Sequence, residues 1–207
     1  MPPVLEICYI TDRRSLEPKP LLPIIVEAIA AGVDLVQIRE KDLATRALLK
    51  LVEGAVSAAA GTAPRVVVND RLDVALAAGA AGVHLGTRSL PAAAVRPHVP
   101  NGFLIGVSCH SLAEAVAAEQ AKADYILLGP IFETPSKLAY GPPLGLEKLR
   151  EVATCVKLPL LALGGITVER VKPCLDAGAT GIAGISIFQC APSLAARVRE
   201  LRMQFAR

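Results

Sequence analysis

The chain has 207 residues with a formal net charge of +3, and 53% of them are hydrophobic but only 3% aromatic. This length fits one large α/β domain or barrel with an aliphatic core. Its basic residues are dispersed and not interleaved with aromatic ones, so nucleic acid is not expected as a partner. Apolar runs stay well short of about 20 residues, and no basic segment precedes an apolar one at the N-terminus. We therefore expect a cytoplasmic protein with no membrane partner.

The cysteines are odd in number, widely spaced and never in a CxxC pair, which argues against both a disulfide framework and a zinc site. We expect buried, reduced thiols. The residues concerned are Cys8, Cys109, Cys155, Cys174 and Cys190.

Short β-branched runs alternate with Ala- and Leu-rich stretches of helical spacing. The runs predict strands at residues 6–11, 35–39, 65–69, 82–85, 104–108, 125–129, 158–163 and 181–186. The helical patterns lie at residues 21–31, 44–60, 72–78, 112–121, 146–156, 168–177 and 192–205. A weak repeat of helix end, turn and strand begins at residues 31, 78, 121 and 177. Successive βα units are connected most simply in a closed (β/α)₈ TIM barrel, a single domain over residues 1–207, with an open doubly wound sheet as the alternative.

Polar residues follow most of the predicted strands, at the barrel end where active sites are built. After the second strand, alternation places Gln37, Arg39 and Lys41 on one side. Two inward cations favour a bound phosphate or diphosphate, whereas ion pairs with Glu40, Asp42 or a neighbouring strand are the structural alternative.

The third strand ends in VNDR, where Asp70 follows Asn69. Asp70 either caps the next helix or binds Mg²⁺. After the fifth strand, His110 lies near Ser108, and a histidine at this place could transfer protons near neutral pH; a rim histidine beside a helix cap is its structural alternative.

Two glycine-containing turns follow the seventh and eighth strands, LALGGIT at residues 161–167 and GIAGISI at residues 181–187. Barrel phosphate sites are commonly built there, so Gly164, Gly165, Ile185 and Ser186 are predicted to hold one phosphate unless these are only tight turns. After the sixth strand, residues 135–145 form a predicted lid, and this region supplies Thr134, Ser136 and Lys137. A solvated loop lysine is the alternative for Lys137.

In this order, the motifs YITD, QIREKD, VNDR, GVHLG, IGVSCHS, GPIFETPSK, LGGI and GISI resemble the thiamine-phosphate synthase and TenI superfamily over essentially the whole chain. The resemblance implies an enzyme of thiamine biosynthesis that binds a small phosphorylated thiazole and, in one branch, a pyrimidine diphosphate. A homodimer is expected by family analogy alone.

The synthase branch couples the two substrates and releases pyrophosphate. By resemblance, Ser108 contacts the developing pyrophosphate, Thr134 and Ser136 lie near the thiazole, and Asp70 binds Mg²⁺. The same resemblance assigns the thiazole phosphate to Gly165, Ile185 and Ser186, and the pyrimidine diphosphate to Gln37, Arg39, Lys41, Asn69 and Lys137.

The chain departs from that pattern after the fourth strand. Synthases usually have a Gln and then, two residues later, an Asp that is the second Mg²⁺ ligand, but HLGTRSLP has Thr87 and Ser89 there. SLP, HS and SKxxYGPPxG resemble TenI-type thiazole tautomerases, which need no cofactor and transfer a proton with a histidine equivalent to His110. We therefore favour a tautomerase, with a Mg²⁺-dependent synthase as the alternative and a non-catalytic thiazole-phosphate-binding regulator as the second. The candidate catalytic residues are His110, Lys137 and Ser108.

Overall fold

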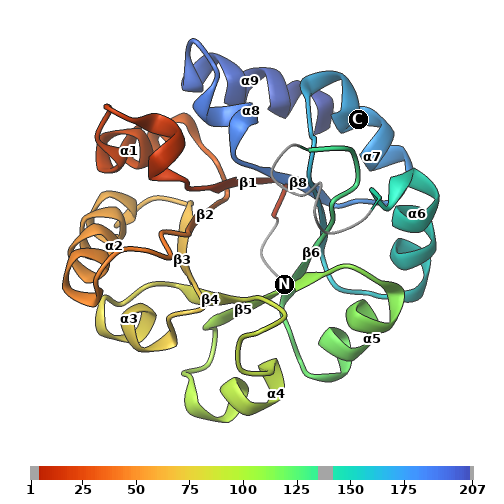
Figure 1. The fold of residues 1–207 in the computed structure, drawn as a ribbon, viewed down its shortest axis with the longest axis horizontal. Helices are drawn as coiled ribbons and strands as arrows, with labels where there is room; N and C mark the ends of the chain where they lie inside the picture. Colours follow the sequence, from red (N-terminus) through yellow and green to blue (C-terminus); the bar gives the residue numbers. More distant parts are fainter. Residues whose placement is uncertain (1–4, 135–141, 206–207) are drawn as a thin grey trace.

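The computed structural model describes residues 5–134 and 142–205, and these residues form a barrel. Eight parallel strands pair in sequence order, and β1 also pairs with β8, which closes the sheet (Figure 1). The predicted (β/α)₈ barrel is confirmed, and the open doubly wound sheet is wrong. All carboxyl ends of the strands therefore meet at one mouth.

The strands are short and mostly buried on both faces, as expected of a parallel sheet covered by helices. They are β1 (Ile7–Ile10), β2 (Leu35–Ile38), β3 (Arg65–Asn69), β4 (Gly82–Leu85), β5 (Leu104–Cys109), β6 (Tyr125–Leu128), β7 (Leu160–Leu163) and β8 (Gly181–Gly184).

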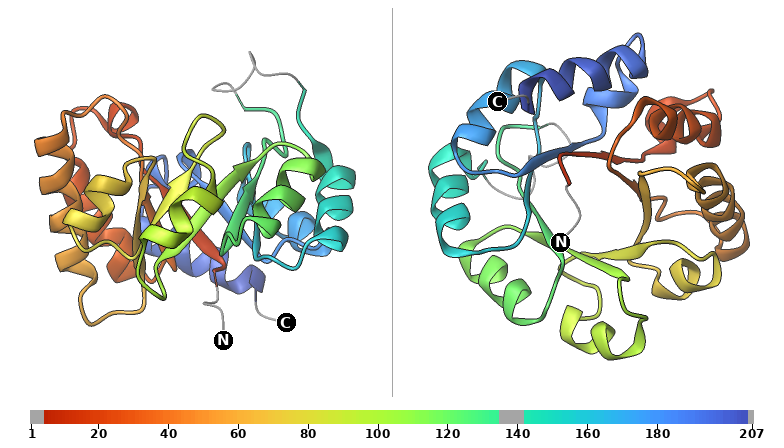
Figure 2. Two further views of the ribbon diagram at one scale, coloured as in Figure 1. Left: turned by 90° about the horizontal axis from the view of Figure 1, so that it is seen from below. Right: turned by 180° about the vertical axis from the view of Figure 1, so that it is seen from behind.

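The helices surround the strands, as the views in Figure 1 and Figure 2 both show. They are α1 (Leu21–Ala31), α2 (Thr45–Ala59), α3 (Leu72–Ala77), α4 (Ala92–Val95), α5 (Leu112–Gln120), α6 (Gly145–Cys155), α7 (Val168–Asp176), α8 (Ser186–Gln189) and α9 (Leu194–Phe205). Two 3₁₀ helices, η1 (Arg13–Leu16) and η2 (Arg96–His98), accompany them.

Every boundary of a predicted element lies within two residues of the observed one, and two of the two-residue differences have local causes. The seventh strand begins at Leu160 and not at residue 158, because Pro159 has no N–H to donate to the sheet. The last helix begins at Leu194, where the Ser193 hydroxyl accepts a hydrogen bond from the Ala196 N–H at 3.2 Å. The four-residue helices α4 and α8 were not predicted, since four residues are too few to show helical periodicity.

The repeat noted in the sequence marks a shared backbone conformation. Its second residue has a positive φ in each copy: 87° at Gly32, 66° at Gly79, 60° at Lys122 and 97° at Gly178. Glycine adopts this left-handed conformation without steric cost, so three of the four copies have the residue that the turn favours. Lys122 is the exception.

The strands separate two layers of apolar side chains. One layer packs between strands and helices, and the other consists of Leu5 and strand residues that fill the barrel interior, including Cys8, Leu35, Tyr125 and Leu161. Because side chains alternate across a strand, interior Leu35 places Gln37 and Arg39 on the inner side nearer the mouth. The interior is thus apolar at depth and polar at the carboxyl ends.

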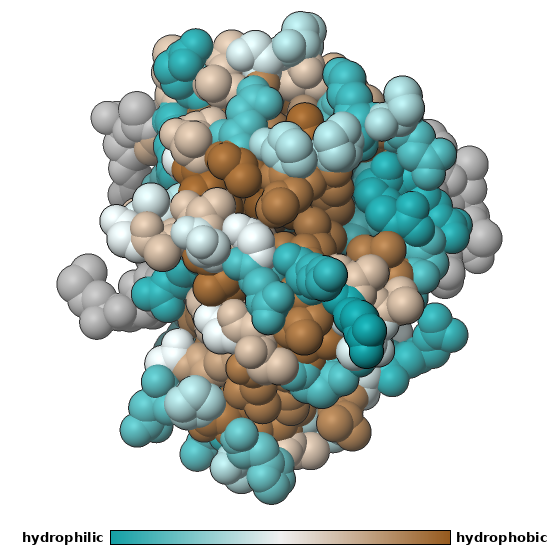
Figure 3. All heavy atoms as spheres, turned by 90° about the vertical axis from the view of Figure 1, so that its left-hand side faces the viewer, coloured by the Kyte–Doolittle hydropathy of each residue, from teal (hydrophilic) through white to brown (hydrophobic). Residues whose placement is uncertain are grey.

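The outer surface over α1, α2 and α3 mixes hydrophilic side chains with apolar areas (Figure 3). None of the helices in the described part of the chain is long and apolar enough to cross a membrane.

The cysteines are free, and Cys8, Cys109 and Cys174 are buried as expected, but Cys155 and Cys190 are exposed. The expectation of burial was therefore wrong for these two.

Candidate active site at the barrel mouth

Arg39 and Lys41 follow β2, with Glu40 between them facing the other way. Glu40 is only 5% exposed, and its carboxylate accepts a hydrogen bond from the Thr11 hydroxyl at 2.6 Å and two from the Arg13 N–H at 3.2 Å. Burial raises the pKa of Glu40, and these hydrogen bonds oppose the rise. Glu40 therefore ties the loop after β1 to the end of β2.

The next acid, Asp42, also pairs with residues of the loop after β1. It accepts a hydrogen bond from Arg14 Nη2 at 2.9 Å and pairs with Arg13 as well. Within residues 5–134 and 142–205, neither Arg39 nor Lys41 forms an ion pair. Ion pairs of the two cations with Glu40 or Asp42, the first part of the structural alternative, are therefore wrong. From the end of the neighbouring strand β3, Asp70 interacts with Lys41 electrostatically without forming an ion pair.

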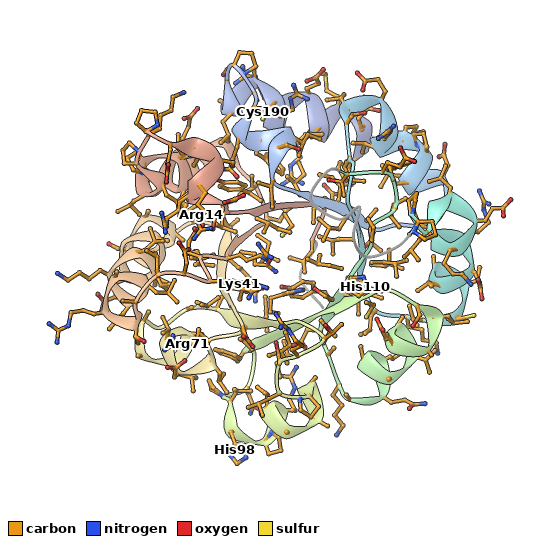
Figure 4. The ribbon with its side chains drawn as sticks, in the orientation of Figure 1. Arg14, Lys41, Arg71, His98, His110 and Cys190 are labelled. Carbon is orange, nitrogen blue, oxygen red and sulfur yellow. The ribbon has the colours of Figure 1, made fainter. Side chains whose placement is uncertain are left out.

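Lys41 lies in a positively charged environment. Its pKa is lowered, first by desolvation and then by the charges of Arg39 and Arg88, while Asp70 opposes the shift. Figure 4 shows Lys41 and His110 lying toward the middle of the barrel, whereas His98 lies at the outer edge. An anion at this place would relieve the repulsion among the cations.

Gln37 adds an unsatisfied donor below the cations. Its side chain is 2% exposed, and its Nε2 has no hydrogen-bond partner in the described part of the chain. A buried donor without an acceptor costs free energy, so a polar ligand reaching into the barrel would be stabilised here.

Asp70 follows Asn69 at the end of β3 and has a φ of 67°, a conformation that Asp and Asn adopt more readily than other non-glycine residues. Its N–H donates to the His84 carbonyl at 2.8 Å, which continues the pairing of β3 with β4. Helix α3 has no side-chain cap, so the alternative in which Asp70 caps that helix is wrong. The Asp70 carboxylate is thus available to a ligand.

Asp70 would be the one carboxylate ligand of a magnesium ion here, and Mg²⁺ binding stays a prediction. In residues 5–134 and 142–205 there is no cluster of three or more His, Cys, Asp or Glu side chains suited to a metal. The Ser89 hydroxyl accepts a hydrogen bond from the Gly86 N–H at 2.8 Å and closes the turn after β4. One carboxylate is enough where substrate phosphates and water supply the other ligands, as is usual for Mg²⁺.

His110 follows β5 with a defined hydrogen-bond pattern. Its Nδ1 contacts the Gly129 carbonyl oxygen, and its backbone N–H donates to Glu114 Oε2 at 2.6 Å. A carbonyl only accepts, so Nδ1 carries the hydrogen in the neutral ring and Nε2 is the basic nitrogen. Both interpretations of His110 fit this geometry, because its backbone N–H bonds to Glu114 of α5 and its Nε2 has a free lone pair in the neutral ring.

Ser108 points inward from β5 and contacts a buried histidine. His84 Nε2 lies 2.9 Å from Ser108 Oγ, and His84 Nδ1 lies 3.1 Å from the Tyr125 hydroxyl. His84 is 1% exposed, and burial, with a smaller contribution from Arg39, lowers its pKa to about 3. His84 is therefore neutral at physiological pH.

The turn after β7 packs tightly on the segment after β6. Gly164 and Gly165 have φ angles of 97° and 63°, and the Gly164 carbonyl accepts from the Phe132 N–H at 3.0 Å. A Cβ on Gly165 would lie 2.8 Å from Phe132 Cβ, so this close approach requires glycine. Ile185 and Ser186 begin the neighbouring turn after β8. A phosphate bound by these four residues remains a prediction.

The segment after β6 is described only in part. Thr134 is half-buried, whereas Ser136 and Lys137 lie outside the described residues, as do residues 135–141 of the predicted lid. Residues 37, 39, 41, 69, 70, 108 and 110 all lie at the carboxyl ends of β2, β3 and β5.

Two contributors to the mouth were not predicted from the sequence. Arg88 adds charge beside Lys41, and its position three residues after strand β4 was the available signal. Tyr125 begins β6 and was treated only as strand sequence; its contact with His84 crosses an intervening strand, which no local pattern reveals.

Together, the closed barrel and the cationic, polar mouth define a (β/α)₈-barrel enzyme with its site at the carboxyl ends of the strands. A family model described as thiamine monophosphate synthase matches residues 7–188. The chain therefore belongs to the thiamine monophosphate synthase family and is an enzyme of thiamine biosynthesis.

Individual relatives agree with the family model. A thiamine-phosphate synthase of Methanoculleus marisnigri is 45% identical over 179 residues, 86% of this chain and 85% of the relative. One of Roseiflexus castenholzii is 40% identical over 195 residues, 94% of this chain and 86% of the relative. The structure of thiamine phosphate pyrophosphorylase from Pyrococcus furiosus superposes with a TM-score of 0.86 at 34% identity, covering 97% of this chain and 95% of that one. These names match the synthase alternative and not the tautomerase that the sequence analysis favoured.

Proposed function

We propose that this enzyme is a thiamine-phosphate synthase, which couples a pyrimidine diphosphate to a thiazole phosphate and releases pyrophosphate. The observation that carries the proposal is that Arg39 and Lys41 lie at the mouth and form no ion pair with an acid in the described part of the chain. A diphosphate supplies the charge that these cations lack. The family model and the named relatives support the same activity.

The site residues have separate tasks in this proposal. Arg39, Lys41 and Lys137 bind the diphosphate, and Gln37 with Asn69 orients the pyrimidine end of the substrate. As the carbon–oxygen bond to the diphosphate breaks, the basic side chains and the Ser108 hydroxyl stabilise the negative charge of the leaving group. Asp70 would hold Mg²⁺, which neutralises further phosphate charge when it is bound.

The thiazole phosphate occupies the opposite side of the mouth in this proposal. Its phosphate binds at the turns after β7 and β8, where the candidate residues are Gly164, Gly165, Ile185 and Ser186. Thr134 and Ser136 lie beside the thiazole ring. We also propose that the enzyme works in the cytoplasm, and the homodimer stays a prediction from family analogy.

A coupled assay tests the proposal directly. Purified enzyme is incubated with pyrimidine diphosphate, aromatic thiazole phosphate and Mg²⁺, and both thiamine phosphate and pyrophosphate are measured. We expect equal amounts of the two products and none without thiazole phosphate. Absence of thiamine phosphate, while a known synthase is active in the same mixture, would contradict the proposal.

The tautomerase is a second candidate because of one observation, the Nδ1 contact of His110 with the Gly129 carbonyl. That contact leaves Nε2 as a base, which aromatisation of the thiazole carboxy-phosphate tautomer by proton transfer requires. To test this candidate, the tautomer is incubated with the same enzyme in the absence of metal, and its aromatisation is measured. His110→Gln should abolish tautomerase turnover while phosphate binding persists; undiminished turnover in this variant would remove His110 from the mechanism.

A further inference from the structure

We propose that Tyr125 and His84 are positioning residues that form a buried hydrogen-bond chain to Ser108 and direct its hydroxyl hydrogen toward the diphosphate. This inference rests on the proposed synthase activity for its functional meaning. The chain itself consists of the two contacts of the His84 ring, 3.1 Å to the Tyr125 hydroxyl and 2.9 Å to Ser108 Oγ.

The strand register brings the members of the chain together. His84 of β4 is paired with Gly106 of β5, and Gly106 is paired with Tyr125 of β6. The three residues therefore form one row across three strands, and Ser108 lies two residues further along β5, on the same inner side and closer to the mouth.

Gly106 is the residue that allows the phenol to cross the middle strand. A Cβ at this position would overlap the Tyr125 ring and its hydroxyl oxygen. The rings of His84 and Tyr125 lie with their centroids 5.6 Å apart, and Tyr125 is fully buried. Because Gly106 of β5 has no side chain, Tyr125 of β6 can extend across β5 and contact His84 of β4.

Burial fixes the direction of the hydrogen bonds. In the described part of the chain, the Tyr125 hydroxyl has one hydrogen-bond partner, His84 Nδ1, so its hydrogen is satisfied only if it donates to that nitrogen. In the neutral ring the hydrogen is then on Nε2, which donates to Ser108 Oγ. The hydrogen of the Ser108 hydroxyl consequently remains for an acceptor at the mouth.

This direction suits a leaving diphosphate. A phosphate oxygen accepts hydrogen bonds and gains negative charge as the bond to the pyrimidine breaks, so a pre-aligned donor stabilises the transition state more than the bound substrate. In the opposite arrangement Ser108 would donate to His84 and present lone pairs to the anion. Tyr125 therefore acts on the reaction through His84 and Ser108, without touching the substrate.

A double-mutant cycle tests the coupling. Tyr125→Phe removes only the hydroxyl, and we expect kcat to fall about three- to tenfold, the worth of one hydrogen bond, with KM little changed. In a Ser108→Ala background the same substitution should have no further effect. An equal reduction in both backgrounds, or no reduction in the wild type, would overturn the proposal.

Tyr9→Phe is the matched control. Tyr9 is also fully buried, and its hydroxyl has no hydrogen-bond partner among the described residues. It packs on Phe188 of α8, outside the barrel interior, with ring centroids 5.5 Å apart. We expect wild-type kcat from this variant. Melting temperatures of all variants show whether a loss of activity reflects unfolding.

Nitrogen NMR tests the chain independently of activity. The protein has three histidines, so substitution of His98 and His110 by Gln assigns the signals of His84. We expect one neutral tautomer with the hydrogen on Nε2, and in Tyr125→Phe a mixture of both tautomers. A hydrogen on Nδ1 in the wild type would overturn the proposal. If the wild type forms no thiamine phosphate but has the expected tautomer, the synthase assignment is wrong while the hydrogen-bond chain from Tyr125 through His84 to Ser108 is confirmed.

Discussion

The Thr11 hydroxyl donates a 2.6 Å hydrogen bond to Glu40, the acid that lies in sequence between the two cations of β2. This contact directs the carboxylate away from Arg39 and Lys41, and Thr11 Oγ1 also accepts from the Arg39 N–H at 2.9 Å. The loop after β1 therefore both positions the end of β2 and prevents internal neutralisation of its cations. Because neither cation pairs with Glu40, the mouth carries positive charge that an anionic ligand can neutralise.

Arg39→Met should weaken binding of inorganic pyrophosphate at least about tenfold, because a charge-assisted hydrogen bond contributes roughly 1.5–3 kcal/mol. Arg14→Met is the matched control, since Arg14 is exposed and is already paired with Asp42. Titration calorimetry at fixed ionic strength measures both affinities. Equal weakening by the two substitutions would mean that net charge, and not the site, governs binding.

The affinity for pyrophosphate should fall as Lys41 loses its proton, and this fall should occur at lower pH than for a lysine with an ordinary pKa. Its pKa is lowered by desolvation and by the charges of Arg39 and Arg88, so its positive charge is present at low pH and is lost as the pH rises through that lowered pKa. Affinity should fall over the same interval.

Lys41→Arg separates this effect from the ionisation of pyrophosphate itself, because arginine stays charged throughout. Dissociation constants are measured for both proteins from pH 7 upward. We expect the ratio of the wild-type constant to the variant constant to rise with pH. A ratio that does not change with pH would remove Lys41 from the anion site.

The sequence was sufficient for the barrel and for most residues at its mouth. Alternation along β2 correctly placed Gln37 and Arg39 inside, because the period of two is a property of the strand itself. It did not reveal that Glu40 is held by Thr11, nor that Tyr125 contacts His84 across Gly106. Those contacts depend on the register between strands, which a single sequence does not encode locally.

Lys122→Gly should stabilise the protein by about 1 kcal/mol, because Lys122 has a φ of 60° at a turn where the three equivalent positions have glycine. The contact that this turn makes with Arg96 involves the Lys122 carbonyl, which the substitution retains. Lys122→Ala is the control and should not stabilise, since alanine has the same steric cost in this conformation. Urea unfolding measures both, and equal stabilisation by the two would contradict the backbone explanation.

Asp70→Asn tests the metal proposal without disturbing the turn. Asparagine also adopts the left-handed conformation at Asp70, where φ is 67°, so we expect a folded variant with an unchanged melting temperature. Removing the carboxylate should lower Mg²⁺-dependent turnover roughly 100-fold, since charge stabilisation by the metal contributes several kcal/mol.

The matched control for Asp70 is Asp73→Asn, because Asp73 lies in the adjacent helix α3 and pairs with Arg71 at 2.6 Å. Calorimetry adds a second measurement. With a single carboxylate, the wild type should bind Mg²⁺ weakly alone and more tightly with pyrophosphate, whose oxygens complete the coordination. The Asp70→Asn variant should lose this synergy while binding of pyrophosphate alone persists. Tight binding of Mg²⁺ to the wild type without pyrophosphate would instead require further protein ligands.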